Sequence, residues 1–190
     1  MVANDTYLFD PQVIQNLDWS LVGKDCDLKL SEKGLKLRPL RIDDFDHGHL
    51  DVLSQLSVVG TISRKDYEER FQLMKSSQLM RIIILEDLNT NQVAASATLL
   101  FEPKFTHECA WVGHVQDVVV DGKYRGQGLG KALVLCLKLL VLHQGAYKMD
   151  LDCADDKISF YKSLGFTQES GRANYLTCRF EKKNQNLTVL

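Results

Sequence analysis

The chain has 190 residues, of which 45% are hydrophobic, and a formal net charge of −2. This length predicts a single domain, and the near-neutral charge excludes the basic footprint of a nucleic-acid-binding protein. The most apolar run is too short to span a membrane, and the N-terminus lacks the apolar core of a signal peptide. Five cysteines without a CxxC pair predict a reducing, cytoplasmic compartment and no structural metal site.

The first half of the chain predicts an N-terminal extension followed by strands and helices. The extension, residues 1–34, carries one short helix signal after Pro11. Apolar periodicity and turn residues then predict a strand, two helices and a hairpin, at 35–40, 43–57, 63 onwards, 80–87 and 92–101. Ser63 and Asp66 predict a capping box at the start of the second helix.

The second half alternates strands with helices. The pattern predicts a strand, an apolar helix, a strand, a short helix ended by Gly165 and a last strand, at 112–120, 128–144, 146–153, 157–164 and 174–181. A polar tail follows at 182–190. The order β-α-α-β-β-β-α-β-α-β predicts an α/β fold with a mixed central sheet.

The most informative stretch, residues 117–131, predicts a strand, a turn and a glycine loop. Val118-Val119-Val120 is typical of a buried strand, and Asp121-Gly122 is a turn signal. Arg125-Gly126-Gln127-Gly128-Leu129-Gly130 then opens the apolar helix. A helix N-terminus offers unpaired N–H groups and a partial positive charge, so this loop is expected to bind phosphate.

Two common glycine loops do not fit this stretch. A P-loop needs glycine at Arg125 and Ser or Thr at Ala132, and a dinucleotide fingerprint needs glycine at Lys131. What remains is Arg-Gly-x-Gly-x-Gly after an apolar strand, which resembles the acetyl-CoA pyrophosphate loop of the GCN5-related N-acetyltransferase (GNAT) superfamily. The resemblance implies acetyl-CoA as cosubstrate and a mixed, mostly antiparallel sheet flanked by helices.

Further fragments resemble one family of that superfamily, the glucosamine-6-phosphate N-acetyltransferases. These fragments are Lys104-Phe-Thr-His107, Val115-Gln-Asp-Val-Val-Val120, Tyr147-Lys148, Leu151-Asp-Cys153, Phe160-Tyr161, Gly165-Phe166 and Arg179-Phe180. The resemblance covers residues 35–181, which are therefore expected to form the catalytic domain. It implies direct acetyl transfer from acetyl-CoA to the amine of glucosamine 6-phosphate, on the route to UDP-N-acetylglucosamine.

The resemblance assigns acetyl-CoA to the glycine loop and the strand before it. The residues concerned are Val118, Val119, Val120, Arg125, Gly126, Gln127, Gly128, Leu129, Gly130 and Lys131. Backbone N–H groups of the loop can hold pyrophosphate oxygens, with Arg125 and Lys131 adding charge. Strand N–H groups near Val118 are the candidates for the oxyanion contact, while the valine side chains are ordinary sheet core.

Two residues in the later part of the chain are candidates for the chemistry. The resemblance makes Tyr161 the general acid for the leaving thiolate and a contact to acetyl-CoA, and it makes Asp152 the group that orients the reaction centre. Structural roles stay open for both: helix–sheet packing for Tyr161, and a structural hydrogen bond for Asp152, which is expected to be buried on a strand. Cys153, predicted on the opposite face of that strand, is expected to be a core residue and not an acetyl carrier.

The resemblance assigns the sugar phosphate to several separated segments. The residues concerned are Ser57, Lys104, Phe105, Thr106, His107, Gln116, Asp117, Val118, Tyr147, Lys148, Asp152 and Arg179. A phosphate needs cations, although any one of these charges alone is typical of a solvated surface. In the family, the residue matching Arg179 acts across a dimer interface, so the resemblance implies a homodimer.

Gln116 departs from the family pattern, which has Glu at this position. Glutamine can form hydrogen bonds but cannot accept a proton, so a positioning role is expected, with water or Asp152 relaying the amine proton. Two other functions stay open: a GNAT enzyme for another small amine, and a non-catalytic acetyl-CoA binder. A polyamine enzyme would line its cleft with acidic residues, whereas the matched positions here are mostly cationic.

Overall fold

A computed structural model describes residues 6–22, 29–169, 180–183 and 186–189. The chain forms two compact units, residues 1–151 and 152–190. The first unit contains a five-stranded sheet and the helices on both of its faces. The described part of the second unit contains a short helix and a strand pair.

The sheet has the strand order β1-β2-β3-β4-β5. Its strands are β1 (Leu35–Pro39), β2 (Met80–Asp87), β3 (Gln92–Pro103), β4 (Trp111–Val120) and β5 (Lys148–Asp150). All neighbours are antiparallel except β4 and β5, which are parallel. The predicted α/β fold with a mixed, mostly antiparallel sheet is confirmed, as is the predicted hairpin of β2 and β3.

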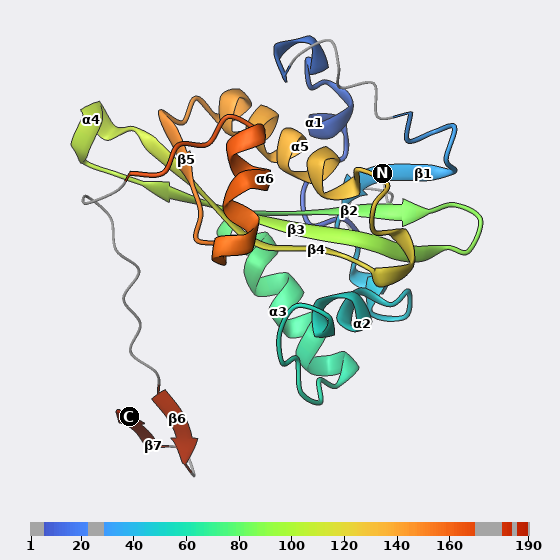
Figure 1. Cartoon of the computed structure of the whole chain (residues 1–190). Coiled ribbons are helices and arrows are strands. Elements are labelled where there is room, and N and C mark those ends of the chain that lie inside the picture. The colour runs from blue at the N-terminus through green and yellow to red at the C-terminus, as the bar shows by residue number, and fades with distance from the viewer. Residues whose placement is uncertain (1–5, 23–28, 170–179, 184–185, 190) are drawn as a thin grey trace. The chain divides into compact units, whose positions relative to one another are not determined.

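One face of the sheet is covered by α5 (Leu129–Gln144) together with α1 (Gln12–Gln15) (Figure 1). Ten of the sixteen α5 residues are buried, which confirms the prediction of a buried, apolar helix. Ile14 and Leu17 of the N-terminal segment are buried in the same core cluster. This segment, predicted as an extension, therefore contributes to the core of the first unit.

The opposite face carries α2 (His49–Ser54) and α3 (Arg64–Ser77) (Figure 1). The predicted capping box is confirmed, because Ser63 accepts from the Asp66 N–H and Asp66 accepts from the Ser63 N–H. The single helix predicted over 43–57 is wrong. Its place is taken by a 3-10 turn, η3 (Ile42–Phe45), and the short α2, separated by Gly48 with a φ of 82°. A left-handed residue cannot continue a right-handed helix, so the chain turns there.

A buried polar network lies on the α2 and α3 side. Arg38 forms ion pairs with Asp44 at 2.7 Å and with Glu86 at 2.8 Å, and all three side chains are nearly inaccessible to solvent. His49 is also buried, with its Nδ1 2.9 Å from the Tyr67 hydroxyl. Buried charges need such partners, so these contacts are part of what fixes α2 and α3 against the sheet.

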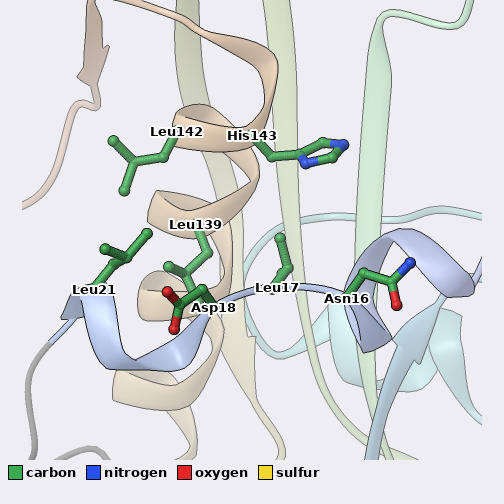
Figure 2. Close-up of a pocket in the computed structure, with 7 residues that line it drawn as sticks. All are labelled: Asn16, Leu17, Asp18, Leu21, Leu139, Leu142 and His143. Carbon is green, nitrogen blue, oxygen red and sulfur yellow. The ribbon is translucent and has the colours of Figure 1, made fainter.

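A small pocket of about 220 Å³ lies between the N-terminal segment and α5 (Figure 2). Leucine side chains of both segments form most of its wall, and Asp18 and His143 lie at its rim; the full lining is Asn16, Leu17, Asp18, Leu21, Leu139, Leu142 and His143. Pockets that bind small molecules usually exceed about 300 Å³. The N-terminal segment thus packs on α5 with a slight gap.

No helix among the described residues is long and apolar enough to cross a membrane.

The second unit begins with a 3-10 turn, η5 (Asp155–Lys157), and continues into α6 (Ile158–Ser163). The chain then turns at Gly165, with a φ of 86°, as predicted. The strand predicted over 146–153 ends at Asp150, so it is shorter than expected. Most of the last predicted strand, 174–181, lies outside the described residues, and β6 (Phe180–Lys183) pairs antiparallel with β7 (Asn186–Val189).

Candidate functional site

The glycine loop leads from β4 into α5 through a 3-10 turn, η4 (Gly122–Tyr124). Gly126 and Gly128 both adopt left-handed conformations, with φ values of 78° and 81°. A Cβ added at either glycine would meet no heavy atom within 4 Å. Packing within the chain therefore does not require these glycines, whereas their left-handed backbone conformation favours them.

Helix α5 begins directly after Gly128 and runs for 16 residues. The first N–H groups of a helix have no partners within the helix, and the helix dipole makes this end attractive to anions. An exposed loop with open space above it and a long helix behind it suits a pyrophosphate. The residues present therefore fit the acetyl-CoA that the sequence predicts.

Side chains at the entry to this loop fix its position. The Tyr124 hydroxyl donates to Asp87 at 2.6 Å, which ties the loop to the end of β2. Arg125 Nε donates to the Val120 carbonyl at 3.1 Å, and its Nη2 lies 3.4 Å from Gln55 Oε1. The guanidinium of Arg125 thus bonds back to the start of the loop. From the other side, Lys33 donates to the Gln127 carbonyl at 3.0 Å, a contact that sequence reasoning missed.

Strand β4 contains a bulge beside the loop. The register with β3 shifts between Thr98, which faces Gln116, and Ser96, which faces Val119. Asp117 has a φ of 51°, an uncommon value for a residue other than glycine. Gln116 and Asp117 are both exposed. The bulge re-aims this part of β4, as bulges near active sites often do.

The pairing of β5 with β4 leaves the bulged part of β4 without a neighbour in the sheet on that side. Among the described residues, β5 pairs with β4 only at Val112, Gly113 and His114. Beyond His114, the β5-side edge of β4 runs on to Val120 with no strand beside it among the residues that the structure describes. The segment of β4 that the sequence predicts to supply the oxyanion donors therefore lies beyond the part of β4 that pairs with β5.

A row of five charged or titratable side chains crosses the other end of β4. Lys104 forms an ion pair with Glu102, which lies 2.8 Å from His114 Nε2. His114 Nδ1 lies 2.5 Å from Asp150, and Asp150 lies 2.9 Å from Lys148. The hydrogen bond from Lys104, and then that from His114, lowers the pKa of Glu102.

This row changes the interpretation of two predicted phosphate ligands. Lys104 and Lys148, both predicted to bind the sugar phosphate, lie at the two ends of this row. Each forms an ion pair with a carboxylate of the chain itself, so a phosphate would have to share the lysine with that carboxylate. Sequence reasoning missed Glu102, His114 and Asp150. The signal was weak, because the three residues lie on three strands and meet only once the register is known. Within the described part of the chain, no group of three or more His, Cys, Asp or Glu residues could hold a metal ion.

The connection between β3 and β4 is a strained turn, labelled α4 (Thr106–Cys109). Three successive residues there, His107, Glu108 and Cys109, have φ values between 52° and 61°. The ring of His107 lies 4.2 Å from that of Tyr147, so these two predicted site residues do meet. Phe105 is 98% exposed, and Thr106 is also exposed. Ser57, at the end of α2, is exposed as well.

The second unit holds both predicted catalytic residues. The ring of Tyr161 packs against Phe160 and Phe166, with centroids 5.0 Å and 5.7 Å apart. Burial, and to a lesser extent Cys153, raises the pKa of the Tyr161 hydroxyl, so it holds its proton at neutral pH. Asp152 is not in a strand and is exposed, so the expectation of a buried carboxylate is wrong.

Cys153 is also exposed, contrary to the prediction of a core residue. Partial burial and then the nearby carboxylates, Asp152 first, raise the pKa of its thiol. A raised pKa disfavours the nucleophilic thiolate. Arg179 lies outside the described residues.

Both the sequence and the fold of this chain match known proteins. Residues 44–166 match the model of the acetyltransferase (GNAT) family. The chain belongs to this family. The sequence-based resemblance to the superfamily is thereby confirmed, together with the fold that it implied.

Relatives within the GNAT family share most of their length with this chain. A probable glucosamine 6-phosphate N-acetyltransferase of Drosophila melanogaster is 39% identical and covers 95% of this chain and 85% of its own. Glucosamine 6-phosphate N-acetyltransferase 1 of Dictyostelium discoideum is 33% identical, covering 83% and 92%. The crystal structure of glucosamine-6-phosphate N-acetyltransferase from Arabidopsis thaliana superposes with a TM-score of 0.71 at 32% identity, over 75% of this chain and 97% of that one. The predicted resemblance to this enzyme family is confirmed.

Proposed function

We propose that this protein transfers the acetyl group of acetyl-CoA to the amine of D-glucosamine 6-phosphate. The products are N-acetyl-D-glucosamine 6-phosphate and CoA. The observation that carries the proposal is the likeness to relatives named for this reaction, which extends over 95% of the chain in the Drosophila protein. The geometry of the glycine loop supports acetyl-CoA as the donor.

In this mechanism, the first unit binds the donor. The N–H groups from Gly126 to Lys131, at the start of α5, bind the pyrophosphate, and the open edge of β4 receives the pantetheine arm. The thioester carbonyl then lies against strand N–H groups near Val118. Those donors stabilise the oxyanion that forms when the amine attacks, because they are already oriented by the bulge.

The transfer itself is direct. The neutral amine attacks the thioester carbon and forms a C–N bond, and the tetrahedral intermediate expels the thiolate as the C–S bond breaks. Tyr161 donates its proton to that thiolate, because its hydroxyl is protonated at neutral pH. Water, aided by Asp152, carries the proton that the amine loses.

The sugar phosphate lies along β4 in this proposal, with its amine near the bulge and its phosphate towards the start of β5. His107, Tyr147 and Lys148 gather around the start of β5, and the rings of His107 and Tyr147, which are tilted by 30° to one another, supply an aromatic surface suited to a sugar. Ser57, Gln116 and Asp117 are exposed and can hydrogen-bond sugar hydroxyls. Arg179 supplies a further cation for the phosphate.

The proposal extends to assembly, location and pathway. We infer a homodimer in which Arg179 completes the site of the partner subunit, and a cytoplasmic enzyme on the route to UDP-N-acetylglucosamine. Mixing two inactive variants tests the dimer. Arg179→Ala and Tyr161→Phe chains, once exchanged into mixed dimers, regain activity at one intact site if the residue acts across the interface. They stay inactive if each site is made by one chain.

The reaction is tested by following thiol release from acetyl-CoA with four candidate acceptors: glucosamine 6-phosphate, glucosamine, spermidine and a peptide amine. Rapid release with the phosphorylated sugar alone is expected. Faster release with spermidine or the peptide would replace the sugar phosphate with another amine. If the protein binds acetyl-CoA but releases no thiol with any of the four acceptors, a non-catalytic acetyl-CoA binder would be favoured.

A further inference from the structure

Gln55 lies at the C-terminal end of α2, and its side-chain amide reaches the chain just before the glycine loop. Its Nε2 donates to Asp121 Oδ2 at 2.9 Å, and its Oε1 accepts the Gly122 N–H at 2.9 Å. The N–H can only donate and the carboxylate can only accept, so the two partners together fix which way the amide faces.

The segment that Gln55 contacts is itself well anchored. Asp121 donates its N–H to the Ala94 carbonyl at 2.9 Å and accepts from the Lys123 N–H at 2.8 Å. Arg125, whose Nη2 lies 3.4 Å from Gln55 Oε1, also bonds back to the Val120 carbonyl. A displacement of the glycine loop would therefore also displace the Gln55 amide, because the segment from Asp121 to Arg125 joins the loop to the hydrogen bonds of Gln55.

Gln55 also belongs to the turn that carries a candidate sugar contact. Ser57 follows two residues later, and its N–H donates to the Leu53 carbonyl at 3.1 Å, which holds it in the turn that follows α2. The Gln55 N–H bonds within the same turn. One side chain thus joins the α2 turn, on which the sugar is proposed to bind, to the segment that enters the cofactor loop.

We propose that Gln55 is a positioning residue that couples acetyl-CoA binding at the glycine loop to sugar-phosphate binding at the α2 turn. The inference rests on the proposed function, since it needs both ligands. A bound pyrophosphate holds the loop, the loop holds Asp121 and Gly122, and these hold Gln55 and the turn that contains Ser57. Such coupling is reciprocal, so each ligand must tighten the other by the same factor.

Calorimetry with CoA, which binds without turnover, measures this factor. CoA affinity is compared with and without saturating glucosamine 6-phosphate, for the wild type, Gln55→Ala and Gln55→Glu. In the wild type, the sugar is expected to tighten CoA binding by about fivefold or more. Gln55→Ala should bring the factor close to one. Gln55→Glu should do the same, because it replaces the donor with a second carboxylate beside Asp121.

Gln72→Ala is the matched control, since it makes the same change at an exposed position on α3. It should retain the wild-type factor. Unchanged coupling in Gln55→Ala, or an equal loss in Gln72→Ala, overturns the inference while leaving the proposed function intact, provided that thiol release with glucosamine 6-phosphate persists. A wild-type chain that neither binds nor acetylates the sugar phosphate overturns the proposed function and the inference together.

Discussion

The two ends of β4 use different chemistry. At the C-terminal end, the candidate site is made of backbone: two left-handed glycines, an open strand edge and a helix N-terminus. At the N-terminal end it is made of side chains that meet across three strands, with His114 between Glu102 and Asp150. Backbone chemistry leaves a contiguous pattern in the sequence, whereas cross-strand chemistry leaves only scattered charges.

The largest expected effect breaks the C-terminal end alone. Gly128→Ala should raise the KM for acetyl-CoA about 100-fold, because a Cβ would stand in the open space over the loop and the residue would be strained at a φ of 81°. The KM for the sugar phosphate should change little. Steady-state kinetics with each substrate varied in turn makes the measurement.

Gly145→Ala separates backbone strain from the loss of ligand binding. Gly145 ends the same helix with a φ of 74°, and an added Cβ there would also meet nothing within 4 Å. Both variants should lose similar stability, about 1 kcal/mol each. An equal rise in the acetyl-CoA KM in both variants would mean that Gly128 has only a structural role.

Sequence reasoning succeeded where the signal was local. The Ser63 capping box and the glycine loop are each contained in a few consecutive residues, and both are found as predicted. It failed where tertiary structure decides. The helix over 43–57 is broken at Gly48, although a lone glycine is only a weak break signal against the apolar periodicity on both sides of it. Strand β5 stops at Asp150 because its pairing with β4 ends there, and that limit is a property of the register.

The charged row shows the same limit at the level of the site. Lys104 and Lys148 could be predicted as cations, but not their ion pairs with Glu102 and Asp150. Those partners reach the lysines only through the register of β3, β4 and β5. The exposure of Asp152 and Cys153 could likewise not be predicted from the sequence, because the alternating pattern implied a strand that does not form there.

The second prediction tests the packing of α2 against the sheet that contains β4, through the buried His49. Burial lowers the pKa of His49 to about 4 in the folded protein, from 6.5 when unfolded. Between these values the unfolded chain binds the proton and the folded chain does not, so stability falls as the pH drops. At about pH 5 the loss should reach about 2 kcal/mol relative to neutral pH.

Thermal or denaturant unfolding at several pH values measures this loss. His49→Asn should flatten the dependence between about pH 4 and 6.5, since asparagine does not titrate there. His143→Asn, at an exposed position near the end of α5, should leave the dependence intact. A His49→Asn protein that keeps the full wild-type pH dependence would assign the acid sensitivity to other groups.

The third prediction breaks the N-terminal end of β4. Lys148→Ala should raise the KM for glucosamine 6-phosphate about tenfold, because a phosphate loses one cation near Asp150. The acetyl-CoA KM should stay the same. Lys65→Ala removes another ion-paired lysine, on α3, and serves as the control. A rise in the acetyl-CoA KM instead would place Lys148 in donor binding and erase the division between the two ends.

The smallest expected effect lies between the two ends, at Gln116. This residue is exposed on β4, next to Asp117 with its left-handed backbone. Regular alternation along the strand puts the side chains of His114 and Gln116 on the same face. Gln116→Glu supplies the carboxylate that the family pattern has there. Turnover should stay equal or rise by up to about twofold, because in the proposed mechanism water carries the amine proton and a carboxylate adds only a second acceptor.

Gln116→Ala sharpens this last comparison by removing the hydrogen bonds without adding a charge. If Gln116 positions the sugar, the alanine variant should raise the sugar KM while the glutamate variant does not. If the amide N–H donors are themselves required, both variants lose turnover. In that case, the middle of β4 would depend on a side chain peculiar to this protein, and its chemistry would resemble that of the charged row more than that of the backbone loop.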